Sequence, residues 1–147
     1  MKNPFPRSLL GWAQVATITA ALAAVGGVVN AARINARTAS LQAEITAVEL
    51  LHGYMRLSLE HPDLANRAED LPAEPRYEWF AAHAYVTAEA IYRLMRGNPA
   101  WDSTVAGIVQ YHKRFVLDGK FACPDFDSAF ATLVSANVGG GFRCMRQ

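Results

Sequence analysis

The residues that could do chemistry in this chain are few, and they do not form a complete set. Glu49 and His52 are three apart, which is the Glu-x-x-His step that holds metal in helical di-iron proteins. Such a site needs a second step, but neither His83 nor His112 has a glutamate three residues before it. A metal-dependent enzyme centred on Glu49, His52, Glu89 and His112 is therefore the least favoured hypothesis.

The other common signatures of catalysis and cofactor binding are absent. The sequence contains no phosphate-binding loop, no Gly-x-Ser-x-Gly and no His-Glu-x-x-His. Cys123 and Cys144 match no zinc or redox spacing, and the sequence leaves open whether they are paired. The net charge of +1 gives no basic excess for nucleic acid. We therefore expect no catalytic activity, no cofactor, no metal site and no nucleic-acid partner.

His112 lies on the apolar face of a predicted helix, where a histidine is usually a core residue with one hydrogen-bond partner such as a tyrosine. The second hypothesis is a small-ligand sensor or binding module with His112, Tyr111 and Tyr85 near an enclosed cleft between helices. Glu89 and Arg93, four residues apart, are expected to form an exposed ion pair on one helix.

An apolar segment from Leu9 to Ala32 dominates the N-terminal part of the chain. It contains no charged residue and is bracketed by Arg7 and Arg33. A helix of this length spans about 36 Å, and a bilayer core is about 30 Å thick. Val29–Ala31 fits a signal-peptide cleavage site, but the run exceeds the length of a signal's apolar region. The sequence predicts one uncleaved transmembrane helix.

This segment is rich in small residues, which allow a neighbouring membrane helix to approach closely. Those that recur three or four apart are Ala13, Thr17, Ala20, Ala24, Gly27 and Ala31. They are the predicted contacts to other membrane proteins within the lipid bilayer. The sequence leaves open whether the partner is a second copy of the chain. The alternative explanation is that the protein is simply rich in alanine. The positive charges flanking the segment favour a cytoplasmic N-terminus only faintly.

The rest of the sequence predicts helices and no strand, so the fold class is all-α, with the transmembrane helix continuing into a small helical bundle. The predicted parts are a tail over 1–8, the membrane helix over 9–32, the bundle over 33–138 and a tail over 139–147. The first helix should run to about Leu59, since Pro62 disfavours helix before it. Further helices are expected over 76–96, 99–118 and 124–138, with Asn98 as N-cap and Pro99 at the first position of the second, and with Gly139 to Gly141 ending the third. The predicted core face of the helix over 76–96 is Tyr77, Phe80, Ala84, Ala88, Ile91 and Met95, and that of the helix over 124–138 is Phe126, Phe130, Leu133 and Asn137.

Two further apolar features concern packing. Ile34, Leu41, Val48 and Met55 recur every seven residues, with Ile45 and Leu59 beside them. This narrow seam suits a coiled coil or a neighbouring helix, and we expect it to pack on the chain's own helices.

The other apolar feature lies on the predicted helix over 76–96. There Trp79 and Val86 fall opposite the core face, where an exposed tryptophan is a candidate partner contact.

Several short motifs resemble a loose group of small bacterial single-pass membrane proteins of unknown function. They are the segment Tyr54–Leu64 with its His-Pro-Asp-Leu turn, the helix Ala84–Tyr92, the tryptophan-led helix Trp101–Phe115 and the segment Phe121–Phe126. The group has no established activity, so the resemblance implies architecture alone. The leading hypothesis is a non-enzymatic accessory or scaffold subunit in the bacterial inner membrane, bound to other membrane proteins.

Overall fold

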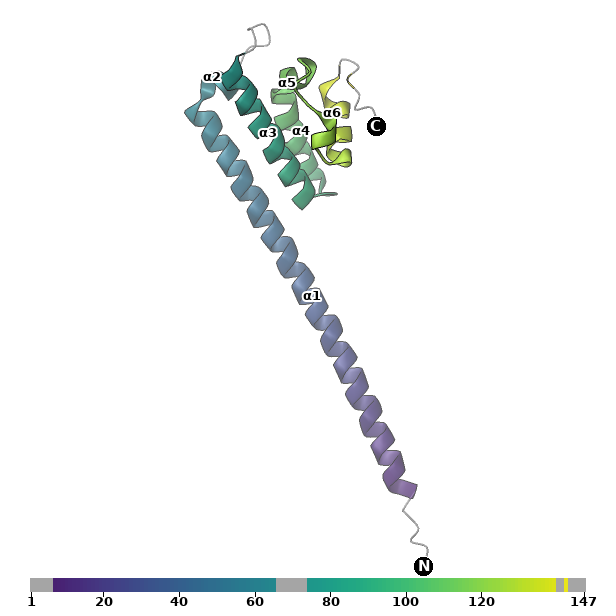
Figure 1. Ribbon diagram of the computed structural model, residues 1–147. Helices are drawn as coiled ribbons and strands as arrows, with labels where there is room; N and C mark the ends of the chain where they lie inside the picture. Colours follow the sequence, from purple (N-terminus) through teal and green to yellow (C-terminus); the bar gives the residue numbers. More distant parts are fainter. Residues whose placement is uncertain (1–6, 66–73, 140–141, 143–147) are drawn as a thin grey trace, which may run out of the picture. The chain divides into compact units, whose positions relative to one another are not determined.

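The computed structural model describes residues 7–65, 74–139 and 142, with side chains described from residue 26 onward. Every regular element in this part of the chain is helical, which confirms the all-α fold class (Figure 1). The chain divides into two units, one ending at Gln42 and the other beginning at Ala43. Most of the two predicted terminal tails lies outside the described residues.

The first helix, α1, is a single element from Arg7 to Glu60. It ends where the sequence predicted, because the ring of Pro62 clashes with helical backbone at the preceding residue. The chain then enters α2, a single turn over Pro62–Ala65 whose Leu64 is buried in the core of the second unit.

Over the side chains that the structure describes, no helix reaches the length and apolarity that a membrane crossing requires. The predicted membrane segment Leu9–Ala32 is helical in its backbone, but its side chains are described only from Gly26 onward. Among the candidate contact residues of that segment, Gly27 and Ala31 are exposed. The remaining four lie outside the described side chains: Ala13, Thr17, Ala20 and Ala24.

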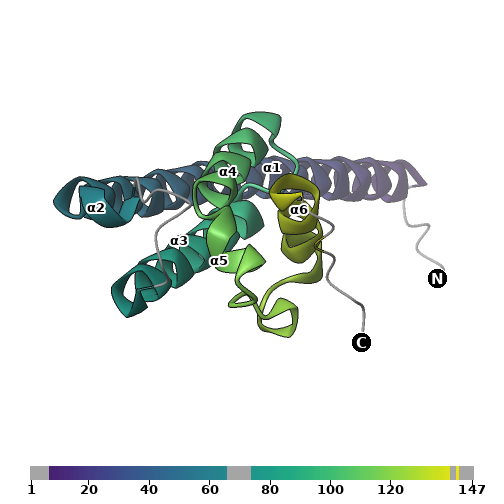
Figure 2. The ribbon, with the colours of Figure 1, turned by 90° about the horizontal axis from the view of Figure 1, so that it is seen from above.

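The second unit is built around three helices, α3 over Pro75–Leu94, α4 over Pro99–Tyr111 and α6 over Ser128–Val138. The helix α4 packs against both α3 and α6 (Figures 1 and 2). The predicted core face of α3 is confirmed, since Tyr77, Phe80, Ala84, Ala88 and Ile91 are all buried. The last residue predicted for that face, Met95, is only partly buried.

Local sequence explains most of the helix ends in this unit. The side chain of Asn98 accepts a hydrogen bond from Ala100 N at the start of α4, and Pro99 occupies the first helical position, as predicted. The helix α6 ends at Gly139, whose φ of 71° is a conformation that other residues rarely adopt.

The predicted helix over 99–118 is wrong in one respect, because it is broken at His112. The structure has α4 up to Tyr111 and a separate short helix, α5, over Lys113–Leu117. At the break, His112 O accepts a hydrogen bond from Phe115 N, and the buried hydroxyl of Tyr85 donates to two backbone carbonyl oxygens. It lies 3.1 Å from Val109 O and 3.4 Å from His112 O. No glycine or proline marks this break in the sequence.

The predicted helix over 124–138 starts later than expected. A short 3-10 turn, η1, covers Cys123–Asp125, and α6 begins at Ser128 with Asp127 as its N-cap. The predicted core face is also partly wrong. Of its four residues only Phe130 is buried, while Phe126, Leu133 and Asn137 are half-buried. The buried face instead consists of Phe130, Ala131, Val134 and Val138.

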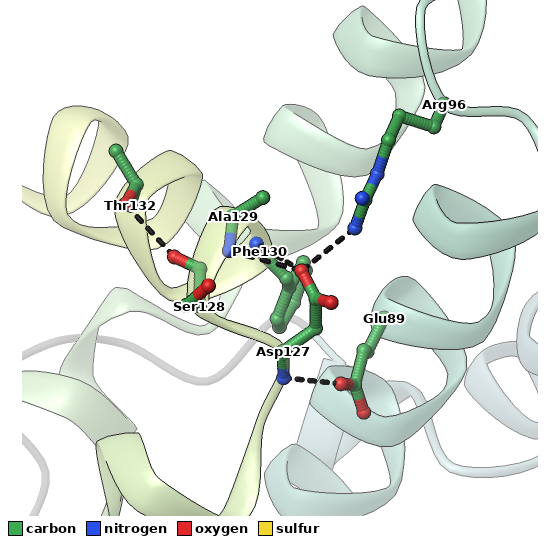
Figure 3. Close-up of polar contacts among 7 residues, drawn as sticks. All are labelled: Glu89, Arg96, Asp127, Ser128, Ala129, Phe130 and Thr132. Carbon is green, nitrogen blue, oxygen red and sulfur yellow. Dashed lines mark hydrogen bonds and ion pairs between the residues drawn. The ribbon is translucent and has the colours of Figure 1, made fainter.

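Asp127 links α6 to α3 (Figure 3). Its carboxylate accepts hydrogen bonds from Ala129 N and Phe130 N and pairs with Arg96 at 2.7 Å. Its backbone N–H donates to Glu89 Oε1 at 2.6 Å. Desolvation alone would raise the pKa of the Asp127 carboxyl. The hydrogen bonds from Phe130 N and Ala129 N and the Arg96 guanidinium together outweigh it and hold the pKa below its usual range. Glu89 therefore binds the start of α6 and does not form the predicted pair with Arg93.

The predicted packing of the seven-residue seam on α1 is wrong. The face of α1 that contacts the core of the second unit contains the buried Ala47 and the partly buried Leu50, Leu51, Tyr54 and Leu57. The seam residues Ile34, Leu41, Ile45, Met55 and Leu59 are exposed. The pattern located an apolar stripe correctly, but the chain's own helices do not cover it in the described part of the structure.

Candidate functional site

The most distinctive polar contact of the second unit joins α1 to the break between α4 and α5. The hydroxyl of Tyr54 lies 2.9 Å from Nε2 of His112, so the two groups share a hydrogen bond. His112 is fully buried, and its predicted role as a core histidine with a tyrosine partner is confirmed. The sequence did not identify which tyrosine, because Tyr54 and His112 are 58 residues apart.

Aromatic rings surround this pair. The imidazole of His112 lies 5.4 Å from the ring of Phe80, 6.0 Å from that of Tyr77 and 6.1 Å from that of Tyr54, measured between centroids. Because this apolar setting disfavours a charged imidazolium, burial lowers the pKa of His112 to about 4. Burial also raises the pKa of the Tyr54 hydroxyl. Both groups are therefore neutral near pH 7.

The surroundings of His112 limit what the pair can do chemically. A neutral imidazole has one donor and one acceptor nitrogen. Nε2 bonds to Tyr54, while Nδ1 is buried and has no hydrogen-bond partner among the described residues. Since no part of His112 is exposed, a substrate could reach only Tyr54, which is half-buried. The arrangement fits a structural hydrogen bond that fixes α1 on the bundle.

An open groove of about 520 Å³ lies next to this pair. It is formed by the end of α1, the α2 turn and the middle of α4. Most of its surface is apolar, with hydroxyl groups from serine, threonine and tyrosine side chains. The lining residues are Tyr54, Met55, Ser58, Leu59, Pro62, Ala65, Thr104, Gly107, Ile108 and Tyr111. A groove of this size can accept a small apolar ligand or a large apolar side chain.

The groove differs from the cleft predicted for a sensor. Of the three residues expected there, Tyr111 lines the groove, whereas His112 and Tyr85 are buried in the core and do not. The groove is also open, where the hypothesis expected an enclosed pocket. The sequence missed the contribution of Pro62 and Ala65, because nothing local shows that the α2 turn folds back beside α4.

The residues of the metal hypothesis are not brought together. Among the described residues there is no group of three or more His, Cys, Asp or Glu side chains placed to hold a metal ion. His112 is bonded to Tyr54, and Glu89 is bonded to Asp127. Glu49 and His52 are exposed on α1.

A second candidate surface lies on the outer side of α3. Trp79 is 79% exposed and Val86 is 56% exposed, and His83 between them is also exposed. The spacing of four and then three residues places all three on one helix face. Both apolar residues lie opposite the core face of α3, as the sequence predicted.

Comparisons with known protein families, with curated proteins and with solved structures gave no match for this chain.

The Tyr54–His112 hydrogen bond should contribute measurably to stability. In Tyr54→Phe the ring is retained, but Nε2 of His112 is left buried without a partner. We expect the free energy of unfolding to fall by about 1–3 kcal/mol, the cost of an unsatisfied buried group. Urea denaturation of the full chain in detergent, monitored by circular dichroism, measures this change.

The matched control is Tyr111→Phe, which removes the same hydroxyl from an exposed side chain that also lines the groove. It should change stability by less than about 0.5 kcal/mol. Equal effects of the two substitutions would show that the hydrogen bond contributes nothing specific.

Burial of His112 also predicts how stability depends on pH. The pKa of the imidazole falls from 6.5 in the unfolded chain to about 4 in the folded chain. Between these pH values the unfolded state binds more protons, so stability decreases as the pH is lowered. The loss from this one group is at most on the order of 3 kcal/mol, because one pKa unit corresponds to about 1.36 kcal/mol. Denaturation curves at pH 7 and pH 4.5 measure the loss.

Carboxylates also titrate in this range, so the contribution of His112 is isolated by comparison with His112→Gln, whose pH dependence should be shallower. NMR titration of the His112 ring in the unaltered chain gives a second measurement. A midpoint near 6.5 would contradict the buried, neutral state.

Proposed function

We propose that this chain is a single-pass membrane protein that serves as a helical accessory or scaffold subunit, without catalytic activity, and binds other membrane proteins. The observation that supports this most directly is the exposure of Trp79 beside Val86 on the outer face of α3. The membrane anchor is the apolar segment Leu9–Ala32, and its small residues are the proposed contacts within the bilayer.

An exposed tryptophan of this kind favours a protein partner. Its indole presents a large apolar area to water, and tryptophan is among the residues most enriched at the energetic centres of interfaces. Val86 extends the apolar surface along the same helix face, and His83 adds a polar group between the two. This pattern of an apolar centre with polar neighbours is typical of a contact surface between proteins.

The state of Cys123 supports one orientation of the chain. Cys123 is disulfide-bonded, and the one other cysteine in the sequence, Cys144, lies outside the described residues. Disulfides persist in oxidising compartments and are rare in the reducing cytoplasm. We therefore propose a bacterial inner-membrane protein with a cytoplasmic N-terminus and with the helical bundle on the opposite, oxidising side. The faint charge bias around the anchor favours the same orientation.

The scaffold function predicts co-purification that depends on Trp79. The tagged full chain, isolated in mild detergent, should bring down one or more membrane proteins in stoichiometric amounts. Trp79→Ala should reduce their recovery at least tenfold, because truncating a tryptophan at an interface centre costs about 2 kcal/mol or more. Quantitative mass spectrometry measures the recovery.

Leu117→Ala is the matched control, since Leu117 is an exposed apolar residue on a different helix, at the end of α5. It should leave recovery unchanged. Purification of the unaltered chain alone, without stoichiometric companions, would contradict the proposed function.

The groove beside Tyr54 supports a second candidate function, the binding of a small apolar ligand. Its lining combines aliphatic and aromatic surface with hydroxyl groups from Ser58, Thr104 and the tyrosines. Such a surface suits a flat apolar molecule with one or two hydrogen-bonding atoms. The groove is separate from the Trp79 face, so the two candidate functions can be tested independently.

Substitution at Gly107 tests the ligand hypothesis. A Cβ atom at this position would meet nothing within 4 Å, so Gly107→Leu should fill the groove and leave the fold intact. The probe is indole, which we expect to shift the NMR signals of Ile108 and Ala65 in the unaltered chain. The control is Gly53→Leu, at a site outside the groove, where the same shifts should be seen. In Gly107→Leu these shifts should disappear. Persistence of the shifts in that variant would place the probe elsewhere.

A further inference from the structure

The proposed scaffold function does not use an exposed apolar stripe on α1, whose last two members, Met55 and Leu59, also line the groove. In the second unit the stripe contains Ile45 and Met55, each about half exposed, and Leu59, which is 80% exposed. Val48 lies between them and is partly buried. In the first unit Ile34 and Leu41 continue the same spacing, at 54% and 61% exposed. A soluble surface helix normally turns such residues toward a core.

The stripe follows the heptad pattern of a two-stranded coiled coil. Its members fall on the a and d positions of a heptad, which alternate at intervals of three and four residues. The a positions are Ala31, Thr38, Ile45, His52 and Leu59, and the d positions are Ile34, Leu41, Val48 and Met55. The register runs for about four heptads, with an apolar residue at every d position and with Ala31, Ile45 and Leu59 apolar at a.

The bundle leaves this stripe accessible to another helix. The directions of the two sets of side chains around the α1 axis can be compared at 100° per residue. The mean direction of the stripe residues Ile45, Met55 and Leu59 lies roughly 145° from that of the residues that contact the core. The latter are Ala47, Leu50, Leu51, Tyr54 and Leu57. The two faces of α1 are therefore nearly opposite. A second helix can lie along the stripe on the side away from Ala47, Leu50 and Leu51, and at Met55 and Leu59 it would also border the groove.

We propose that the occupant of this stripe is the α1 helix of a second copy of the chain, in a parallel, in-register coiled coil. A seam of a and d residues is self-complementary, since the same residues meet across the twofold axis. A β-branched residue at a, such as Ile45, with leucine at d, such as Leu41, favours two strands. Polar residues at a, here Thr38 and His52, fix the register. The parallel direction rests on the proposed membrane anchor, which gives both copies the same orientation.

The charges beside the seam provide a directional test of this arrangement. In a parallel, in-register pair, a residue at g faces the residue five positions later, at e, on the other helix. Glu44 then faces Glu49 of the second copy, and both side chains are exposed on α1. These like charges weaken the pair, so Glu49→Lys should replace two repulsions by two attractions.

The test is the mass and the dissociation constant of the full chain in detergent, from light scattering and sedimentation equilibrium. The unaltered chain should have twice the monomer mass. The double substitution Leu41→Glu with Ile45→Glu should weaken dimerisation at least tenfold, and Glu49→Lys should strengthen it severalfold. The control Ala36→Glu with Ser40→Glu adds the same charges at the same spacing to exposed positions outside the seam and should change nothing.

Each contrary result overturns the proposal in an identifiable way. A monomer shows that the stripe does not bind a second copy, whether or not other membrane proteins co-purify through Trp79. A dimer that survives the Leu41 and Ile45 substitutions is held together elsewhere, for example within the bilayer. Weaker dimerisation in Glu49→Lys excludes the parallel, in-register arrangement. Oxidative cross-linking of Leu41→Cys, expected only when the two d positions meet, gives an independent readout of register.

Discussion

The hydrogen bond between Tyr54 and His112 is the contact on which the second unit depends, because it joins α1 to the point where α4 and α5 separate. Two tyrosines form hydrogen bonds with groups at this break. Tyr54 binds the side chain of His112, and Tyr85 donates to the carbonyl oxygens of Val109 and His112. A buried break in a helix is tolerated only when its polar groups find partners. The same contact positions the wall of the groove beside Tyr54.

This contact also determines which face of α1 is left for other molecules. Once Ala47, Leu50 and Tyr54 lie against the core of the second unit, the heptad residues on the opposite side are exposed. One helix therefore has two apolar faces with different uses, one for packing within the chain and one that we assign to a second copy. The face with Trp79 on α3 remains available for a different partner.

The sequence predicted the features that depend on local chemistry. Pro62, Asn98 with Pro99, and Gly139 act on neighbouring backbone, so the ends that they set were predicted closely. The periodicity of α3 identified its buried face. The break at His112 was missed, because it depends on hydroxyl groups that arrive from α1 and α3. The groove was missed because nothing local in the sequence shows that the α2 turn folds back beside α4. The heptad seam was located correctly but assigned to the wrong neighbour, since periodicity shows that a face is apolar and does not show what covers it.

The proposed function requires that α1 anchors the chain in a membrane and presents the bundle on the oxidising side. The most direct test is protease treatment of intact spheroplasts that express the full chain with an epitope at each end, the C-terminal one joined through a cleavable linker. We expect a full-length, membrane-bound chain that loses the C-terminal epitope to the added protease and keeps the N-terminal one. A C-terminal epitope that is cleaved only after lysis, or a full-length chain in the soluble fraction, would contradict it.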